Sequence, residues 1–286
     1  PWIEEIASEY AVNSHISSFT QAEFLSSIKP MMWHLEGPIG GLMNCALSKV
    51  MTDARSCGIT VLLDGTGPDE AFGGYRNHHN TFLASLIQSG EIDVDEHLKN
   101  YSDVWDTTIE EAREAALKEL SLAHFNTAID GTVPVQRDCL KFEFTEYVTP
   151  ELVSSCRTGD AVKDSLVSYL SGSKILRNNR FLDRISMAYS IELRLPFLED
   201  EFVELGINMP NSWYFLDGYT KGVIRSAFDG FMPDSVRMAK KRSIQAPQGL
   251  WLQSKLMQEY VWDMLHTTEF ATRGFFDPGR CQTKYR

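Results

Sequence analysis

Val61-Leu62-Leu63-Asp64-Gly65-Thr66-Gly67-Pro68-Asp69-Glu70-Ala71-Phe72-Gly73-Gly74-Tyr75 is the stretch around which this chain is organised. Residues 59–63 form a nearly continuous apolar run, which predicts a strand buried on both faces of a parallel sheet. Two glycines follow, and Pro68 then fits the first turn of a helix that Gly73-Gly74 ends. The pattern predicts a strand, a glycine loop and a helix N-terminus, the arrangement with which open α/β sheets bind nucleotides.

Asp69 adds a carboxylate to the start of this helix. A carboxylate beside a phosphate site repels the anion unless a divalent cation lies between them, so Asp69 indicates a Mg²⁺ ligand. Gly65 and Gly67 would let backbone N–H groups approach the nucleotide closely. Glycine loops are common, so an ordinary strand–turn–helix corner with a solvated Asp69 is the alternative interpretation of the spacing.

Three blocks of sequence resemble the asparagine synthetase family in its ATP-pyrophosphatase (synthetase) domain. Residues 64–75 are similar to its Ser/Asp-Gly-x-Gly-x-Asp-Glu-x-Phe-Gly-Gly-Tyr loop, and residues 183–199 to its Asp-Arg-x-Ser-Met-Ala-x-Ser-x-Glu-x-Arg-x-Pro-Phe-Leu-Asp signature. Residues 220–225 resemble its Lys-x-x-Leu-Arg helix, and residues 241–251 its Lys-x-Gly-Phe-x-x-Pro-x-x-x-Trp segment. The blocks occur in the family's order, and the resemblance is weakest between residues 80 and 175.

The resemblance implies an enzyme that adenylates a carboxylate with ATP and Mg²⁺ and releases pyrophosphate. Ammonia from glutamine then attacks the acyl-adenylate, and with aspartate as acceptor the product is asparagine. The family match places Asp183 facing the nucleotide loop, where a buried carboxylate with a raised pKa serves as a base. It makes Lys221 the lysine that stabilises charge at the adenylate. The remaining implied site residues are Asp64, Gly65, Gly67 and Lys241 for the nucleotide and Asp69 for the metal; a solvated basic turn is the alternative for Lys241.

Thr66 departs from the family, because asparagine-forming members commonly carry an acid at this loop position. We assign Thr66 to the catalytic set, although a threonine hydroxyl is not a usable base near neutral pH. The sequence therefore leaves open a related ATP-dependent amide synthetase with another acceptor, such as a cyclising or cell-surface-precursor enzyme. A catalytically silent remnant is also open.

The family's Ser-Gly-Gly-x-Asp-Ser pyrophosphate loop does not occur in this sequence, nor does the N-terminal cysteine of a glutaminase domain. We therefore expect a fragment of the synthetase domain, inactive alone, whose fold is a truncated α/β parallel sheet of the adenine-nucleotide α-hydrolase type. Its expected parts are an α/β nucleotide-binding part (1–78), a helical insertion (79–180) and a helical part with Asp183 and Lys221 (181–286). An N-terminal glutaminase domain is the expected partner, and a homodimer is left open.

Composition argues against two kinds of partner. The formal net charge of −12 disfavours nucleic acid, because phosphate contacts need a basic face. No apolar run approaches the roughly 20 residues of a membrane helix.

The five cysteines show no CxxC spacing, which indicates reduced thiols in a cytoplasmic protein.

Local patterns predict further elements along the chain. Helices are expected at 2–11 and 40–54, with a short strand at 15–19. Thr20 and Glu23 form a capping-box pattern whose helix runs through Ile28 and is broken at Pro30.

The later segments give three more predictions. The acidic residues 91–120 predict a solvated helical insertion. His78 and His79, adjacent in sequence, are expected to be solvated or capping and not a metal pair. Glu192 and Arg194 are two apart in an extended segment and are expected to form an ion pair.

Overall fold

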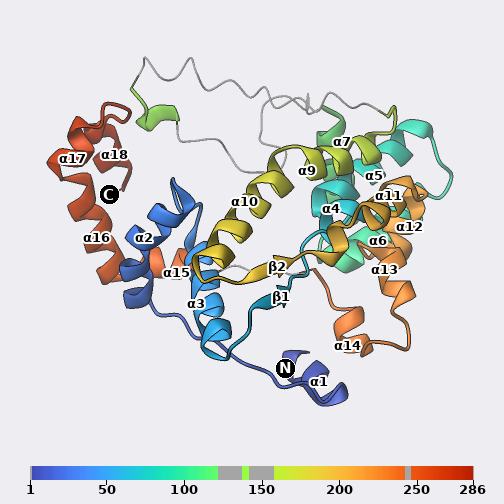
Figure 1. Ribbon diagram of the computed structural model, residues 1–286. Coiled ribbons are helices and arrows are strands. Elements are labelled where there is room, and N and C mark those ends of the chain that lie inside the picture. The colour runs from blue at the N-terminus through green and yellow to red at the C-terminus, as the bar shows by residue number, and fades with distance from the viewer. Residues whose placement is uncertain (1, 122–136, 142–157, 242–245, 286) are drawn as a thin grey trace.

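The computed structural model, shown in Figure 1, describes residues 2–121, 137–141, 158–241 and 246–285. A two-stranded parallel sheet lies near the middle, made of β1 (Val61–Leu63) and β2 (Glu192–Arg194). Val61 pairs with Glu192, and Leu63 pairs with Arg194. Helices make up most of the remainder, so the described chain is a helix-rich α/β protein.

Short and long helices follow one another along the chain. Before β1 and between the strands they are α1 (Trp2–Glu9), α2 (Gln21–Leu35), α3 (Leu42–Ser56), α4 (Pro68–Ala71), α5 (Arg76–Ser89), α6 (Val94–Trp105), α7 (Ile109–Ser121), η1 (Arg137–Cys139), α9 (Ala161–Ser171) and α10 (Ser173–Ala188). After β2 they are η2 (Pro196–Leu198), α11 (Asp200–Asn208), α12 (Asn211–Tyr214), η3 (Leu216–Gly218), α13 (Gly222–Ala227), α14 (Asp234–Arg237), α15 (Gln248–Leu252), α16 (Lys255–Leu265), α17 (Thr268–Thr272) and α18 (Pro278–Tyr285).

The capping box at the start of α2 is confirmed. The amide of Glu23 donates to the Thr20 hydroxyl, and the Glu23 carboxylate accepts from the Thr20 amide at 2.7 Å. The predicted break at Pro30 is wrong, because α2 continues to Leu35 with Pro30 inside it. Burial of Met31 and Leu35 beyond the proline outweighs the lost backbone hydrogen bond. The predicted strand at 15–19 is also wrong, since these residues are irregular.

One hydrophobic core joins the N-terminal helices to the sheet. It contains side chains from α2, α3, α10 and α16, among them Phe24, Met51, Ile185 and Met257, and Leu62 and Leu193 of the two strands pack against it. Figure 1 shows α2, α3 and α15 on one side of the strands and α4, α5 and α6 on the other. The sheet thus connects this core to the helices that carry the glycine loop.

The strand prediction is confirmed for β1, but its burial on both faces is wrong. Val61 is 39% exposed and Leu63 is 73% exposed, whereas Leu62 lies against the core. The described sheet has two strands only, so β1 has one hydrogen-bonded neighbour and one open edge. The apolar side chains of Val61 and Leu63 therefore lie on a face of β1 that no described residue covers fully.

Residues 91–120 contain the helices α6 and α7, as predicted, but these helices pack against α5 and are not solvated on all sides. Leu98 and Tyr101 of α6 and Ala112 and Ala116 of α7 are fully buried together, and a second cluster joins Phe82 and Leu166. Small alanines let α7 approach α5 closely. The acidic residues occupy the outer face of these helices.

His78 and His79 correct a further prediction, because both are fully buried. The ring of His79 stacks on Phe215 at 4.5 Å between centroids and accepts a hydrogen bond from the Trp105 indole at 3.1 Å. Both histidines are thus buried side chains of α5 and are neither solvated nor capping residues.

Two findings concern the membrane and redox expectations. No helix among the described residues is long and apolar enough to cross a bilayer. Cys45, Cys57, Cys139 and Cys281 are free thiols, as predicted, and Cys156 lies outside the described residues.

Candidate functional site

Asp64 holds the start of the glycine loop after β1 through one backbone contact and one side-chain contact. Asp64 extends the parallel ladder by one bond, its amide donating to the Arg194 carbonyl at 2.9 Å. Its carboxylate accepts from the Thr66 amide at 2.8 Å, which closes a turn of the Asx type. The Asp64 side chain therefore shapes the loop, a role that the nucleotide assignment from sequence did not foresee.

The two loop glycines serve different needs. Gly67 has φ +123°, and a Cβ there would come 2.8 Å from a Leu198 methyl, so this glycine is required by packing against η2. A Cβ on Gly65 would meet nothing within 4 Å. Gly65 is therefore the loop position whose backbone is open to a ligand.

Pro68 begins α4 as predicted, and Asp69 in its first turn binds two lysines. Lys221 donates to one carboxylate oxygen of Asp69 at 2.7 Å, and Lys241 donates to the other. These lysines lie 152 and 172 positions away in sequence. All three side chains are more than three-quarters buried, with exposures of 21% for Asp69, 24% for Lys221 and 23% for Lys241.

The electrostatics of this triad favour the ionised carboxylate. Burial alone would raise the pKa of Asp69, but the charges and hydrogen bonds of Lys221 and Lys241 outweigh it and lower the pKa below its ordinary value. Two ammonium groups share one carboxylate, so the triad carries an excess positive charge. The triad is therefore a local positive charge in a chain of net charge −12.

Gly74 fixes the position of Asp69. A Cβ at residue 74 would lie 2.5 Å from the Cα of Asp69, and the Gly74 amide donates to the Asp69 carbonyl at 2.8 Å. The sequence pattern assigned Gly73-Gly74 only to ending the helix. The close approach of residues 69 and 74 is the further reason for a glycine.

Lys221 is held in an unusual backbone conformation. It is the residue before α13 and has φ +56°, the left-handed region that a lysine rarely adopts. A lysine at a helix N-terminus also opposes the helix dipole. Arg225 fixes the preceding residue by donating to the Thr220 carbonyl at 2.8 Å, and Asp69 balances the charge. Strain and charge are thus both maintained to present the ammonium group at Asp69.

The neighbouring lysines 240 and 241 bind in different places. Lys240 donates to the Asp103 carbonyl at 3.0 Å and to the Asp106 carboxylate at the end of α6. Lys241 reaches Asp69. The segment 240–241 therefore ties the helices after the glycine loop to the triad, and it confirms that Lys241 is not part of a solvated turn.

Glu70 and Tyr75 belong to the same site but were not singled out from sequence. Glu70 is 4% exposed, and its carboxylate accepts from the Tyr75 hydroxyl at 2.5 Å. Burial raises the pKa of Glu70 and, more strongly, that of Tyr75. Lys241 lies 5.4 Å from the Tyr75 ring centroid. Both residues lie within the block 64–75 that resembles the family loop, and this was the sequence signal that could have identified them.

The structure does not bring every predicted residue into this cluster. Asp183 lies on α10 and is exposed, so the burial expected for it is not found. Thr66 is half-buried within the loop. Glu192 and Arg194 form the predicted ion pair, with Arg194 Nε donating to Glu192 at 2.8 Å.

Asp69 is the carboxylate of this cluster that would hold Mg²⁺. The described residues contain no group of three or more His, Cys, Asp and Glu able to hold a metal. Mg²⁺ commonly takes one or two carboxylates together with substrate phosphates, so a single Asp fits that need. Both oxygens of Asp69 accept from ammonium groups, however, and a cation must displace one of them.

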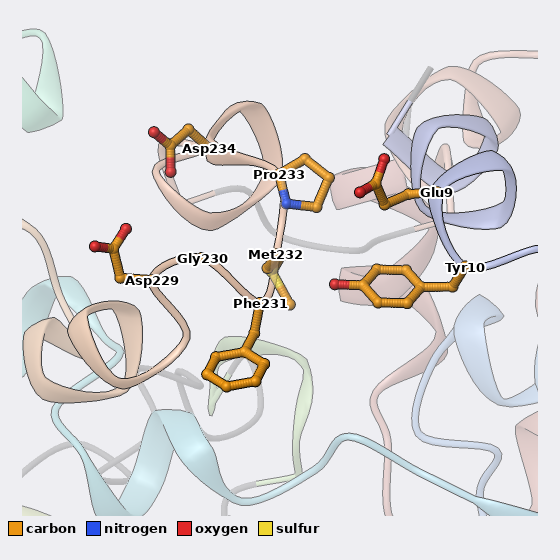
Figure 2. Close-up of a pocket in the computed structure, with 8 residues that line it drawn as sticks. All are labelled: Glu9, Tyr10, Asp229, Gly230, Phe231, Met232, Pro233 and Asp234. Atoms are coloured by element: carbon orange, nitrogen blue, oxygen red, sulfur yellow. The ribbon is translucent and has the colours of Figure 1, made fainter.

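A separate hollow lies between the end of α1 and the turn before α14 (Figure 2). It is lined by Glu9, Tyr10, Asp229, Gly230, Phe231, Met232, Pro233 and Asp234. Arg237 pairs with Asp229 at 2.8 Å and with Asp234 at 2.7 Å, which leaves Glu9 as the remaining carboxylate.

The structure is a helix-rich α/β protein in which an aspartate paired with two lysines follows a parallel strand. The Asparagine synthase family model matches residues 1–286, and the chain therefore belongs to that family. It is 23% identical over 286 residues to asparagine synthetase [glutamine-hydrolyzing] 1 of Bacillus subtilis (strain 168), covering 93% of this chain and 43% of the relative. Asparagine synthetase [glutamine-hydrolyzing] 3 of the same organism is 26% identical over 246 residues, covering 84% of this chain and 35% of the relative. The chain thus spans less than half the length of these relatives.

Proposed function

We propose that this chain is the synthetase part of an ATP-dependent amide-forming ligase. The observation that carries the proposal is the Asp69–Lys221–Lys241 triad beside the open backbone of Gly65. Membership of the Asparagine synthase family supports it, as do relatives whose names specify glutamine hydrolysis. The carboxylate would be activated as an acyl-adenylate with release of pyrophosphate, and ammonia from glutamine would then form the amide.

Each residue of the triad would have a distinct task. Lys221 and Lys241 would bind phosphate oxygens and stabilise charge that develops as the adenylate forms. Asp69 holds both ammonium groups in place in the free protein. With one of them moved from Asp69 to a phosphate oxygen, Asp69 would ligate Mg²⁺, which supplies charge neutralisation for the phosphates. Gly65 would bring backbone N–H groups to the nucleotide, with Gly67 and Asp64 shaping the loop.

Asp183 is the proposed base for the attacking nitrogen. Its exposure means that its position relative to a bound substrate, and not burial, must supply that role. Aspartate is the proposed acceptor, giving asparagine.

Thr66 favours a second candidate, a related amide synthetase with a different acceptor. Its hydroxyl can hydrogen-bond to the adenylate but cannot take a proton from nitrogen. Pyrophosphate exchange measured with aspartate and with other carboxylates distinguishes the two candidates, because adenylation depends on the acceptor.

The test of the shared activity is ATP–pyrophosphate exchange by the full-length protein and its variants Asp69→Asn, Lys221→Ala and Lys241→Ala, because residues 1–286 alone are expected to be inactive. Loss of one charge-stabilising group is expected to lower the exchange rate about 100-fold, equivalent to about 3 kcal/mol. Lys29→Ala, an exposed lysine on α2, is the control for charge. Unchanged exchange in all three variants would contradict the assignment of the triad to the nucleotide.

A further inference from the structure

Lys174 is a cation near the site that the proposed function has not used. It lies in the first turn of α10, and its Nζ is 4.7 Å from the centroid of the Tyr75 ring. No carboxylate pairs with it among the described residues, whereas Lys221 and Lys241 share Asp69 and Lys240 binds Asp106. Lys174 is half-buried, and its charge acts on the Glu70 carboxylate although no salt bridge joins the two side chains.

The Tyr75 ring is fixed in place on several sides. Its hydroxyl donates to the buried Glu70, and its ring lies 5.2 Å from that of Tyr169 and 5.4 Å from that of His78, between centroids. Lys241 is 5.4 Å from the same ring centroid. One rigid aromatic ring therefore has two ammonium groups near it, an arrangement that the ring quadrupole stabilises modestly.

The charges around this ring do not balance. Asp69 and Glu70 are its two acids. Three lysines surround them, so the cluster is positive even with both acids ionised. A ligand that carries several negative charges at separate positions would match three separate ammonium groups better than a single carboxylate would.

We propose that Lys174 is a third anion-binding residue of this site and binds the distal phosphoryl group of a polyphosphate ligand. Tyr75 acts as a positioning residue that holds Lys174 and Lys241 at the same site. This inference rests on the proposed function and assigns to it a phosphate contact from α10, an element that otherwise contributes only Asp183.

The proposal is tested by calorimetric binding of pyrophosphate, ATP and AMP to the full-length protein and to its Lys174→Met variant, which keeps an unbranched stem. Loss of one charge-assisted contact is expected to weaken pyrophosphate and ATP binding about 10-fold. AMP, which lacks the distal phosphoryl groups, should bind as before. Lys174→Arg should restore most of the pyrophosphate affinity, and Lys29→Met should leave all three affinities unchanged.

The outcomes separate this inference from the function on which it rests. If the unmodified protein binds pyrophosphate and Lys174→Met matches it within twofold, the role of Lys174 is refuted and the proposed function stands. An equal loss for AMP and pyrophosphate would also refute it, because the contact would not be to the distal group. If the unmodified protein binds neither ATP nor pyrophosphate, both proposals fail. Thermal unfolding of each variant verifies that the fold is kept.

Discussion

Replacing Gly74 by alanine is expected to move Asp69 away from its lysines. The new Cβ would lie 2.5 Å from the Cα of Asp69, whereas ordinary carbon–carbon contact begins at about 3.5 Å. Rotation of the Asp69 carboxylate could relieve the contact of the new Cβ with its oxygen, but the contact with the Cα requires a displacement of about 1 Å between two backbone segments. Asp69 would then leave the geometry in which each of its oxygens accepts from one lysine.

Two measurable losses follow from this displacement. Overpacking typically costs about 1–3 kcal/mol, so urea unfolding of Gly74→Ala should show a lower free energy of unfolding. Misplacement of a reacting or binding group by about 1 Å can cost about 100-fold in rate, so ATP–pyrophosphate exchange should fall by that order. Gly37→Ala is the matched control, since the nearest atom to its added Cβ is 4.0 Å away.

The reasoning would be refuted by a Gly74→Ala protein that unfolds at the same urea concentration as Gly37→Ala and exchanges pyrophosphate within twofold of it. Such a result would mean that residues 69 and 74 can separate without cost, and that the triad does not depend on the glycine.

Three further substitutions have signs that the structure determines. Glu70→Gln keeps an acceptor for the Tyr75 hydroxyl. Because the pKa of Glu70 is raised in the folded protein, ionisation of Glu70 costs stability as the pH rises above its unfolded pKa of about 4.3. In urea unfolding the variant should therefore gain stability relative to the unmodified protein between pH 4 and 7, with the exposed Glu201→Gln as control. His78 is buried with a pKa lowered to about 3, so the unfolded chain binds its proton first and stability is lost as pH falls from about 6.5; His78→Phe should flatten that loss in thermal unfolding, and an unchanged slope would contradict it. Thr66→Glu should leave ATP–pyrophosphate exchange intact and accelerate asparagine release about 10²-fold or more, whereas slower release would show that an acid is dispensable at this loop position.

Local sequence was sufficient where a neighbouring residue makes the contact. The Thr20–Glu23 capping box and the Glu192–Arg194 pair each join residues no more than three positions apart. The start of α4 at Pro68 is also local, because the fixed φ of proline favours the first turn of a helix. Such patterns depend little on the remainder of the fold.

Sequence was insufficient where tertiary packing decides. The helix through Pro30 persists because residues beyond it are buried, and His78 and His79 are buried because α6, α9 and α12 pack around α5. The exposure of Val61 and Leu63 depends on which strands adjoin β1. None of these is encoded within a short window.

The candidate site shows the same division. Resemblance placed Asp69, Lys221 and Lys241 in one site, but not the sharing of one carboxylate by two lysines. The contact of Gly74 with Asp69, the Glu70–Tyr75 bond and the position of Lys174 over Tyr75 follow only from the folded chain.

The adjacent lysines 240 and 241 have a mechanical consequence. Lys240 binds the end of α6, and Lys241 binds Asp69. The backbone of these two adjacent residues therefore links the end of α6 to the triad. We expect movement of the α6 terminus to be transmitted through a single peptide unit to the Lys241 ammonium group, which we propose binds phosphate. Asp106 binds Lys240 and not a residue of the triad, so its effect on the triad is indirect. Asp106→Asn should therefore change the affinity for pyrophosphate without removing any of the groups proposed to bind it.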